Sequence, residues 1–249
     1  IDELGENFNR MSEQLEKTIS ELKSANNQLL KDIENKEKID QMRQEFLNNV
    51  SHELKTPMTS MKVLADSLVG QQGVPEDLYQ EFMRDITAEI DRENRIITDL
   101  LTLVKMDKKN ADLQIQHMSI NQLLEDILKR LRPIADKRNI DLILDSFRPV
   151  EADVDELKFT SAISNLVENA IKYNVDDGWV RVSLDADHKF FYVTVADSGM
   201  GIPEDSLSRI FERFYRVDKS HSREIGGTGL GLAITRSTIG MHHGVIKVF

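Results

Sequence analysis

The sequence predicts a multidomain protein in which an all-α half, a coiled coil followed by a helical hairpin, precedes an α+β sandwich. Three observations lead to this prediction: a long unbroken stretch with helical apolar spacing, one glycine- and proline-containing break, and a later region of short β-branched runs. The 249 residues, 40% hydrophobic and 30% charged, suffice for one or two buried cores. The high charged fraction is typical of extended helices.

Composition excludes several classes of function. The formal net charge of −11 argues against a nucleic-acid partner, which binds through cationic side chains. The chain has no cysteine, so disulfides and thiolate metal sites are excluded, and no histidine pair has metal-ligand spacing. No apolar run approaches the roughly 18 residues of a membrane helix. Because the chain begins at Ile1 and ends at Phe249 within an apolar run, we expect a fragment that lacks any targeting signal.

The first helical stretch, residues 16–45, is predicted to form a coiled coil. Apolar residues alternate at three- and four-residue steps along one narrow seam, interrupted by Asn26. A buried asparagine at such a position fixes register and favours two strands. A single amphipathic helix packed on a core is the alternative, but no wider apolar face accompanies the seam. The seam comprises Leu15, Ile19, Leu22, Asn26, Leu29 and Ile33.

Residues 46–110 are predicted to form a hairpin of two long helices. Both segments keep helical apolar spacing, and the break at residues 70–75 contains two glycines and a proline. A short connection between long amphipathic helices favours an antiparallel pair. One hairpin cannot bury both apolar stripes, so we expect a homodimer that forms a four-helix bundle.

The motif Ser51-His52-Glu53-Leu54-Lys55-Thr56-Pro57 lies on the first hairpin helix. His52 is off the apolar stripe, so an ordinary exposed histidine is the simplest interpretation. A carboxylate at Glu53 can take or orient the proton on the second ring nitrogen and so make the imidazole a nucleophile. The Thr56 hydroxyl lies one turn further on the same face. Pro57 cannot donate to the Glu53 carbonyl, so the helix is expected to kink or loosen there.

Residues 111–249 are predicted to form the α+β sandwich, with helices on one side of a mixed sheet. The first expected helix is interrupted near Pro133, and the second opens with a capping Asp155. The expected helices span residues 121–138 and 155–174, and the expected strands span 140–144, 180–184 and 190–196.

Asn165, Asn169 and Lys172 share one face of the second of these helices, since they are spaced by four and three residues. Amide oxygens suit Mg²⁺ and an ammonium group suits phosphate. A solvated face with an ion pair between Glu168 and Lys172 explains the same pattern about as well.

Two glycine-containing clusters follow. Asp197-Ser198-Gly199-Met200-Gly201 comes directly after a strand, and its carboxylate can accept from the exocyclic amine of adenine, although a tight turn would use the same residues. Gly226-Gly227-Thr228-Gly229-Leu230-Gly231-Leu232 opens a helix, where successive backbone amides bind anions such as a triphosphate. It is not a Walker A loop, which requires a Gly-Lys-Ser/Thr ending.

Together these motifs resemble the bacterial sensor histidine kinases. Residues 51–57 are similar to their H box, and the later clusters, with Phe211-Glu212-Arg213-Phe214-Tyr215-Arg216, are similar in order and spacing to the N, G1, F and G2 boxes. The resemblance implies a Bergerat-type ATP domain like those of Hsp90 and gyrase B, with ATP and Mg²⁺ as cofactors. It also implies a mobile lid over residues 203–227.

The resemblance further implies site residues. His52 would be the phosphoacceptor, Glu53 its general base and Thr56 the residue used to dephosphorylate a response regulator. Asn169, aided by Asn165, would hold Mg²⁺. The expected nucleotide-binding residues are Asn165, Asn169, Lys172, Tyr173, Asp197, Gly199, Gly201, Gly227, Thr228, Gly229, Leu230 and Gly231.

The resulting expectation is the cytoplasmic part of a membrane sensor, with a HAMP-like linker end at residues 1–15 and an ATP domain at 111–249. Its expected partners are a second copy and a response-regulator receiver domain, and the membrane is reached only through segments absent from this chain. The family usually continues beyond Phe249 into a last strand, so the sheet is expected to be one strand short. A Bergerat-fold ATPase and a non-catalytic dimeric scaffold are the rival interpretations.

Overall fold

The computed structural model describes residues 2–70, 75–106, 113–217 and 227–249, with side chains from residue 10 onward. The chain divides into two units, Ile1–His52 and Glu53–Phe249. The elements in chain order are α1 (Asp2–Gly70), α2 (Glu76–Met106), β1 (Ile115–Ser119), α3 (Ile120–Asp136), β2 (Asp141–Ser146), β3 (Glu151–Asp155), α4 (Glu156–Lys172), β4 (Trp179–Ala186), β5 (Phe191–Asp197), the 3-10 turn η1 (Glu204–Ser206) and α6 (Gly231–Met241).

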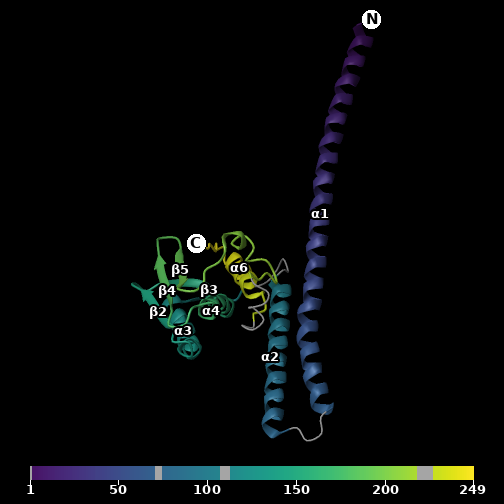
Figure 1. The fold of residues 1–249 in the computed structure, drawn as a ribbon. Coiled ribbons are helices and arrows are strands. Elements are labelled where there is room, and N and C mark those ends of the chain that lie inside the picture. Colours follow the sequence, from purple (N-terminus) through teal and green to yellow (C-terminus); the bar gives the residue numbers. More distant parts are fainter. Residues whose placement is uncertain (1, 71–74, 107–112, 218–226) are drawn as a thin grey trace. The chain divides into compact units, whose positions relative to one another are not determined.

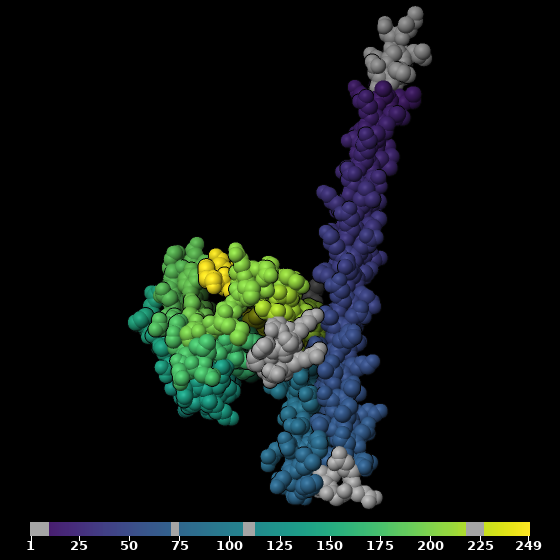
Figure 2. Space-filling model, in the orientation of Figure 1, coloured from purple at the N-terminus to yellow at the C-terminus, as the bar shows by residue number. Residues whose placement is uncertain are grey.

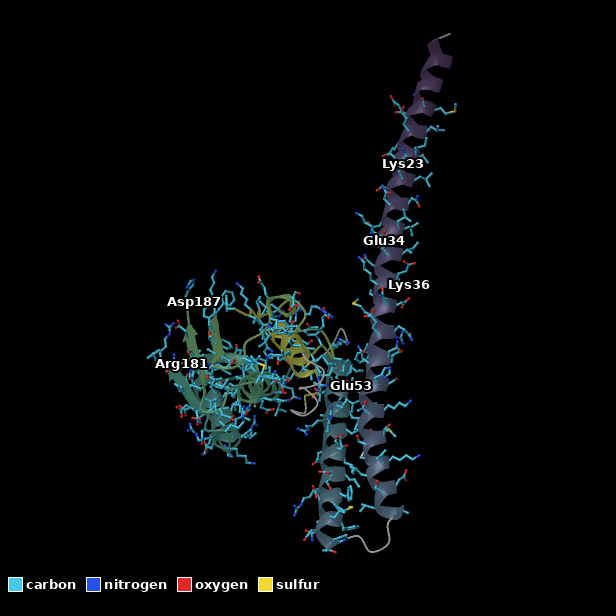
Figure 3. All side chains as sticks on the ribbon, in the orientation of Figure 1. Lys23, Glu34, Lys36, Glu53, Arg181 and Asp187 are labelled. Carbon is cyan, nitrogen blue, oxygen red and sulfur yellow. The ribbon has the colours of Figure 1, made fainter. Side chains whose placement is uncertain are left out.

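The first unit is the leading part of helix α1. Figure 2 shows this stretch as a single rod, and charged side chains such as Lys23, Glu34 and Lys36 project from it in Figure 3. The predicted seam is exposed in the single chain: Leu15 is 61% exposed and Leu22 65%. The single chain therefore leaves the apolar side chains of the seam exposed to solvent. The side chains of the expected HAMP-like stretch before residue 10 lie outside the described residues.

In the second unit, the break between the two long helices falls where the sequence predicts it. Helix α1 ends at Gly70 and α2 begins at Glu76, with residues 71–74 of the connection outside the described part. Glu76 and Asp77 occupy the first turn of α2, where negative charge favours the helix dipole. Pro57 is buried and lies within α1 without ending the helix. Among the described helices, none has the length and apolar content to cross a bilayer.

The α/β region contains two sheets in its described residues. Strand β4 pairs in parallel with β2 and antiparallel with β5, so the three-stranded sheet is mixed, as predicted. Val180, Val182 and Leu184 alternate along β4 and are almost fully buried, while Arg181 and Asp185 are exposed. This alternation presents one apolar face to a core.

Helices α3 and α4 supply the other half of that core. Ile120, Leu124 and Ile127 of α3 and Val167 and Ile171 of α4 are at most 2% exposed and belong to one apolar cluster with the β4 side chains. The helices thus cover one face of the sheet, which confirms the predicted layer arrangement. Figure 1 shows α3 and α4 beside the three-stranded sheet.

Two predictions about this region were wrong or incomplete. Helix α3 is not interrupted near Pro133 but runs to Asp136, because the proline falls in the last turn, where it removes a single hydrogen bond, and Leu131 and Ala135 are buried on either side. The strands β1 and β3, which pair antiparallel with each other, were not predicted. Their sequences carry several polar residues, so they lack a run of β-branched side chains.

Candidate functional site

Helix α4 carries the asparagines and the lysine of the first cluster, and its start is firmly fixed. Asp155 is the N-cap, as predicted, and its carboxylate accepts from the backbone N–H of Lys158 at 3.0 Å and of Gln114 at 3.0 Å. The Lys158 ammonium contacts the same carboxylate at 2.5 Å. Burial raises the pKa of Asp155, but these hydrogen bonds outweigh it and leave the pKa below the usual value.

The end of α4 lies against the glycine-containing loop. A Cβ placed on Gly227 would lie 3.0 Å from Lys172 Nζ, 3.4 Å from the Tyr173 hydroxyl oxygen and 3.7 Å from Arg216 Nη2. The Gly227 backbone is therefore surrounded by two cationic groups and a phenol. Such a ring of donors around a bare backbone suits an anion. Gly226 lies outside the described residues.

Burial first, and then the Arg216 and Arg95 guanidinium groups, lower the pKa of Lys172 from its usual 10.5 to about 8. Among the described residues, no ion pair within 4 Å joins Lys172 to Glu168. The alternative interpretation of this face of α4, an ion pair between Glu168 and Lys172, is therefore not supported by the structure. A half-buried amine beside like charges is stabilised by a bound anion.

Asn165 lies about two helical turns before Lys172 on α4 and faces the start of α6. Its side-chain nitrogen donates to the Gly231 carbonyl at 3.4 Å, which leaves the amide oxygen as an acceptor. Asn169 is half-buried one turn further along. Neutral amide oxygens are ligands of the kind that Mg²⁺ accepts alongside phosphate oxygens. These two residues therefore fit the chemistry of the expected ion and would hold it together with the nucleotide.

The turn after β5 packs on the same end of α4. Gly199 donates its N–H to Asp197 Oδ1 at 2.8 Å, and Met200 donates to the Tyr173 carbonyl at 3.3 Å. A Cβ on Gly199 would lie only 2.5 Å from that carbonyl oxygen, so glycine is required for the approach. Gly201 adopts a positive φ of 69°. The exposed Asp197 thus stands beside α4 on a fixed turn.

The loop that opens α6 is also tightly held. Gly229 adopts a φ of 70°, and its carbonyl accepts from Phe214 N at 2.8 Å. The Leu230 side chain is fully buried in an apolar cluster, so only its main chain borders the loop. The three predicted clusters, separated in sequence, therefore meet around the end of α4. Residues 218–226 of the expected lid lie outside the described part of the chain.

The predicted phosphoacceptor group lies on α1. His52 and Thr56 are exposed and Glu53 is half-buried. Thr56 follows His52 by one helical turn, so both belong to the same face of the helix. The arrangement presents the imidazole to an approaching reagent.

The structure adds residues that the sequence did not single out. Arg95 of α2 acts electrostatically on both Glu168 and Lys172 of α4, and Asp99 acts on Glu168. Arg216 lies at the Gly227 backbone. Burial raises the pKa of Glu168, and nearby cations such as Arg130 oppose the rise. In the sequence, the four-residue spacing of Arg95 and Asp99 was the only sign that these two side chains act together. Ordinary exposed helices have the same spacing of charged residues, so it did not identify a site.

Two family models match the chain, and together they define its class. Residues 42–109 match the His Kinase A (phospho-acceptor) domain, and residues 154–248 match the histidine kinase-, DNA gyrase B-, and HSP90-like ATPase. The fold and the order of the two domains are those of histidine kinases, and the chain belongs to the bacterial sensor histidine kinases.

The particular relatives are WalK kinases. The chain is 35% identical to sensor histidine kinase WalK of Bacillus subtilis (strain 168) over 218 residues, 86% of this chain and 36% of the relative. It is 34% identical to sensor protein kinase WalK of Staphylococcus aureus over 221 residues, 88% of this chain and 53% of the relative. The chain therefore spans between about a third and about half of the relatives' length.

Solved histidine kinases share the fold. Histidine kinase ThkA in complex with response regulator protein TrrA superposes with a TM-score of 0.66, at 24% identity over 80% of this chain and 55% of that one. Acinetobacter baumannii histidine kinase AdeS superposes with a TM-score of 0.59, at 23% identity over 76% of this chain and 86% of that one.

Proposed function

We propose that the protein is an ATP-dependent histidine kinase that phosphorylates His52 of its own sequence. The observation that carries the proposal is the convergence of Lys172, Tyr173 and Arg216 on the bare backbone of Gly227. Such a cluster of donors suits a phosphate group, and the same chain carries an exposed histidine in the region that matches the phospho-acceptor domain. Catalysis would consist of positioning and charge neutralisation.

In the proposed reaction, a ring nitrogen of His52 attacks the γ-phosphorus of ATP. A nitrogen–phosphorus bond forms, the bond from the γ-phosphorus to the bridging oxygen breaks, and ADP leaves. The second ring nitrogen loses its proton to Glu53, which acts as the general base. Asn169 and Asn165 would hold Mg²⁺, which offsets the phosphate charge, and Asp197 would accept from the adenine amine.

The phosphoryl group would then pass to an aspartate on a response regulator. The solved complex of ThkA with a response regulator supports this choice of partner. A dimer is supported by the exposed seam of α1, because Leu15 and Leu22 would be buried by the matching helix of a second copy in a coiled coil. We assign the chain to the cytoplasmic side of a membrane sensor. Its proposed domains are a HAMP-like linker end at residues 1–15, a coiled coil at 16–45, a helical hairpin at 46–110 and an ATP domain at 111–249.

The test is labelling with γ-phosphate-labelled ATP and Mg²⁺. The wild type should acquire acid-labile, alkali-stable phosphate, and His52→Gln should acquire none. Equal labelling of the variant would refute the assignment of His52. A Bergerat-fold ATPase would release phosphate without labelling, and a non-catalytic scaffold would not bind ATP. An Asn169→Asp variant with undiminished nucleotide affinity and labelling would refute the proposed metal role.

Thr56 carries a second proposed activity, dephosphorylation of the regulator. The variant Thr56→Ala should still label with ATP but should dephosphorylate a purified phospho-regulator more slowly. Unchanged dephosphorylation would remove Thr56 from this role. Whether each ATP domain serves its own His52 can be tested with mixed dimers of a His52 variant and an Asn169 variant.

A further inference from the structure

Helix α2 is joined to the glycine-containing loop by a specific hydrogen bond. Thr228 Oγ1 donates to Asp99 Oδ2 at 2.9 Å and accepts from the Leu230 N–H at 3.2 Å. The Thr228 hydroxyl therefore uses its proton on α2 and a lone pair on its own loop. This bond ties α2 to a loop whose Gly227 lies beside the Lys172 and Tyr173 side chains at the end of α4.

An apolar contact reinforces the bond. Leu103 of α2 is 1% exposed and packs with Leu230 and Ile234, which are 0% and 3% exposed. Phe214 packs against the same cluster, and its N–H donates to the Gly229 carbonyl at 2.8 Å. The loop is thus held between α2 and the segment around Phe214. Burial of these apolar side chains stabilises the contact between α2 and the loop.

Arg95 precedes Asp99 by one helical turn, so both side chains rise from the same face of α2. The Arg95 guanidinium favours ionised Glu168 and opposes protonated Lys172, and Arg92 adds to the second effect. Arg95 is exposed, and its Nε donates a long 3.4 Å hydrogen bond to the Asp91 carbonyl. Among the described residues, no ion pair within 4 Å involves Arg95, and it shares its face of α2 with Asp99, whose carboxylate reaches Thr228 of the loop.

Building on the proposed ATP site, we propose that Arg95 of α2 binds the phosphates of the nucleotide held by the same chain, and that Asp99 positions the glycine-containing loop through Thr228. Helix α2 is then part of the nucleotide site. Lys172 and Arg216 already surround Gly227, and a third cation from α2 would add a contact that recognises the phosphate chain and not the base.

The experiment measures the dissociation constants of ATP, ADP and adenosine for the full chain by calorimetry. Arg95→Gln should weaken ATP binding by about tenfold, as expected for loss of one charge-assisted hydrogen bond, and leave adenosine binding unchanged. Arg84→Gln is the matched control, since Arg84 is exposed on the same helix about three turns earlier. Equal ATP affinity in the two variants would overturn the role of Arg95.

Asp99 is a positioning residue, so its test uses a conservative variant. Asp99→Ala should weaken binding of ATP, whereas Asp99→Asn keeps an oxygen that accepts from Thr228 and should lose less affinity. Equal losses in both variants would refute positioning through the hydrogen bond. If wild-type protein fails to bind ATP, the proposed function itself fails. If it binds ATP and Arg95→Gln binds equally well, only the present inference fails.

Discussion

The Nε2 atom of His242 accepts a hydrogen bond from the backbone N–H of Asp155 at 2.9 Å, across 87 positions in the sequence. Its Nδ1 atom lies 2.8 Å from the Thr238 carbonyl and must donate to it. The ring is thus the neutral tautomer with the proton on Nδ1. It also packs edge-on against Phe159, with ring centroids 6.0 Å apart. His242 therefore ties the end of α6 to the start of α4, the helix that carries the site.

Replacement of His242 by alanine should lower the free energy of unfolding by about 1–3 kcal/mol, because the Asp155 N–H is left without an acceptor. Urea unfolding of the full chain measures the change. His188→Ala, at an exposed position between β4 and β5, is the control and should have little effect. Equal stability of the two variants would show that the bond contributes nothing.

Nucleotide affinity should depend on pH through Lys172. Its pKa of about 8 in the free protein should rise when phosphate binds, so binding takes up a proton above pH 8 and affinity should fall there by up to tenfold per pH unit. The effect of Lys172 on the folding of the nucleotide-free protein has the opposite pH dependence. Below pH 8 the charged, half-buried amine lowers the free energy of unfolding, and this destabilisation disappears as the pH rises toward 10.5.

Calorimetry across this pH range measures the effect, with Lys172→Arg as the control. Arginine stays charged throughout, so the pH dependence should disappear. A pH dependence that persists in Lys172→Arg would assign it to another group. In Arg95→Gln the fall should begin at a higher pH, because one repelling cation has been removed from Lys172.

The glycine at position 229 should tolerate no side chain. A Cβ there would lie 2.9 Å from the Phe214 Cα atom, and the positive φ of 70° adds strain of about 1–2 kcal/mol. Gly229→Ala should therefore displace the loop and weaken ATP binding. Gly240→Ala in α6 meets nothing within 4 Å and should leave binding unchanged. A Gly229→Ala protein that binds ATP with wild-type affinity would contradict the predicted clash.

The pKa of His117 should be raised. Hydrogen bonds to Asp153 at 2.8 Å and then to Glu151 at 3.3 Å favour the protonated ring. Any stability from this charge is present below pH 6.5 and lost as the pH rises through the higher pKa of the folded state. An NMR titration should show the shift, and Asp153→Asn should reduce it. Asp126→Asn, on an exposed part of α3, should not. A His117 titration unaffected by Asp153→Asn would be inconsistent with this cause.

Local pattern was a good guide where one segment contains the whole signal. The break between α1 and α2 depends on two glycines and a proline within a few residues. The helix cap at Asp155 depends on the three residues that follow it, because its side chain accepts from the Lys158 N–H. Strands β1 and β3 were missed because polar segments pair only when the chain brings their edges together, as with Ile115 and Asp155. Pro133 was misjudged because buried neighbours sustain a helix that loses one bond.

By itself, the sequence determined the helical hairpin, the motif around His52 and the three clusters of the proposed nucleotide site, because each is specified by residues that are consecutive or one helical turn apart. Only the tertiary structure decided that Thr228 bonds to Asp99, 129 positions away, and that Arg95 adds its charge near Lys172. Such relationships depend on packing of apolar side chains such as Leu103 and Leu230, which no local spacing specifies.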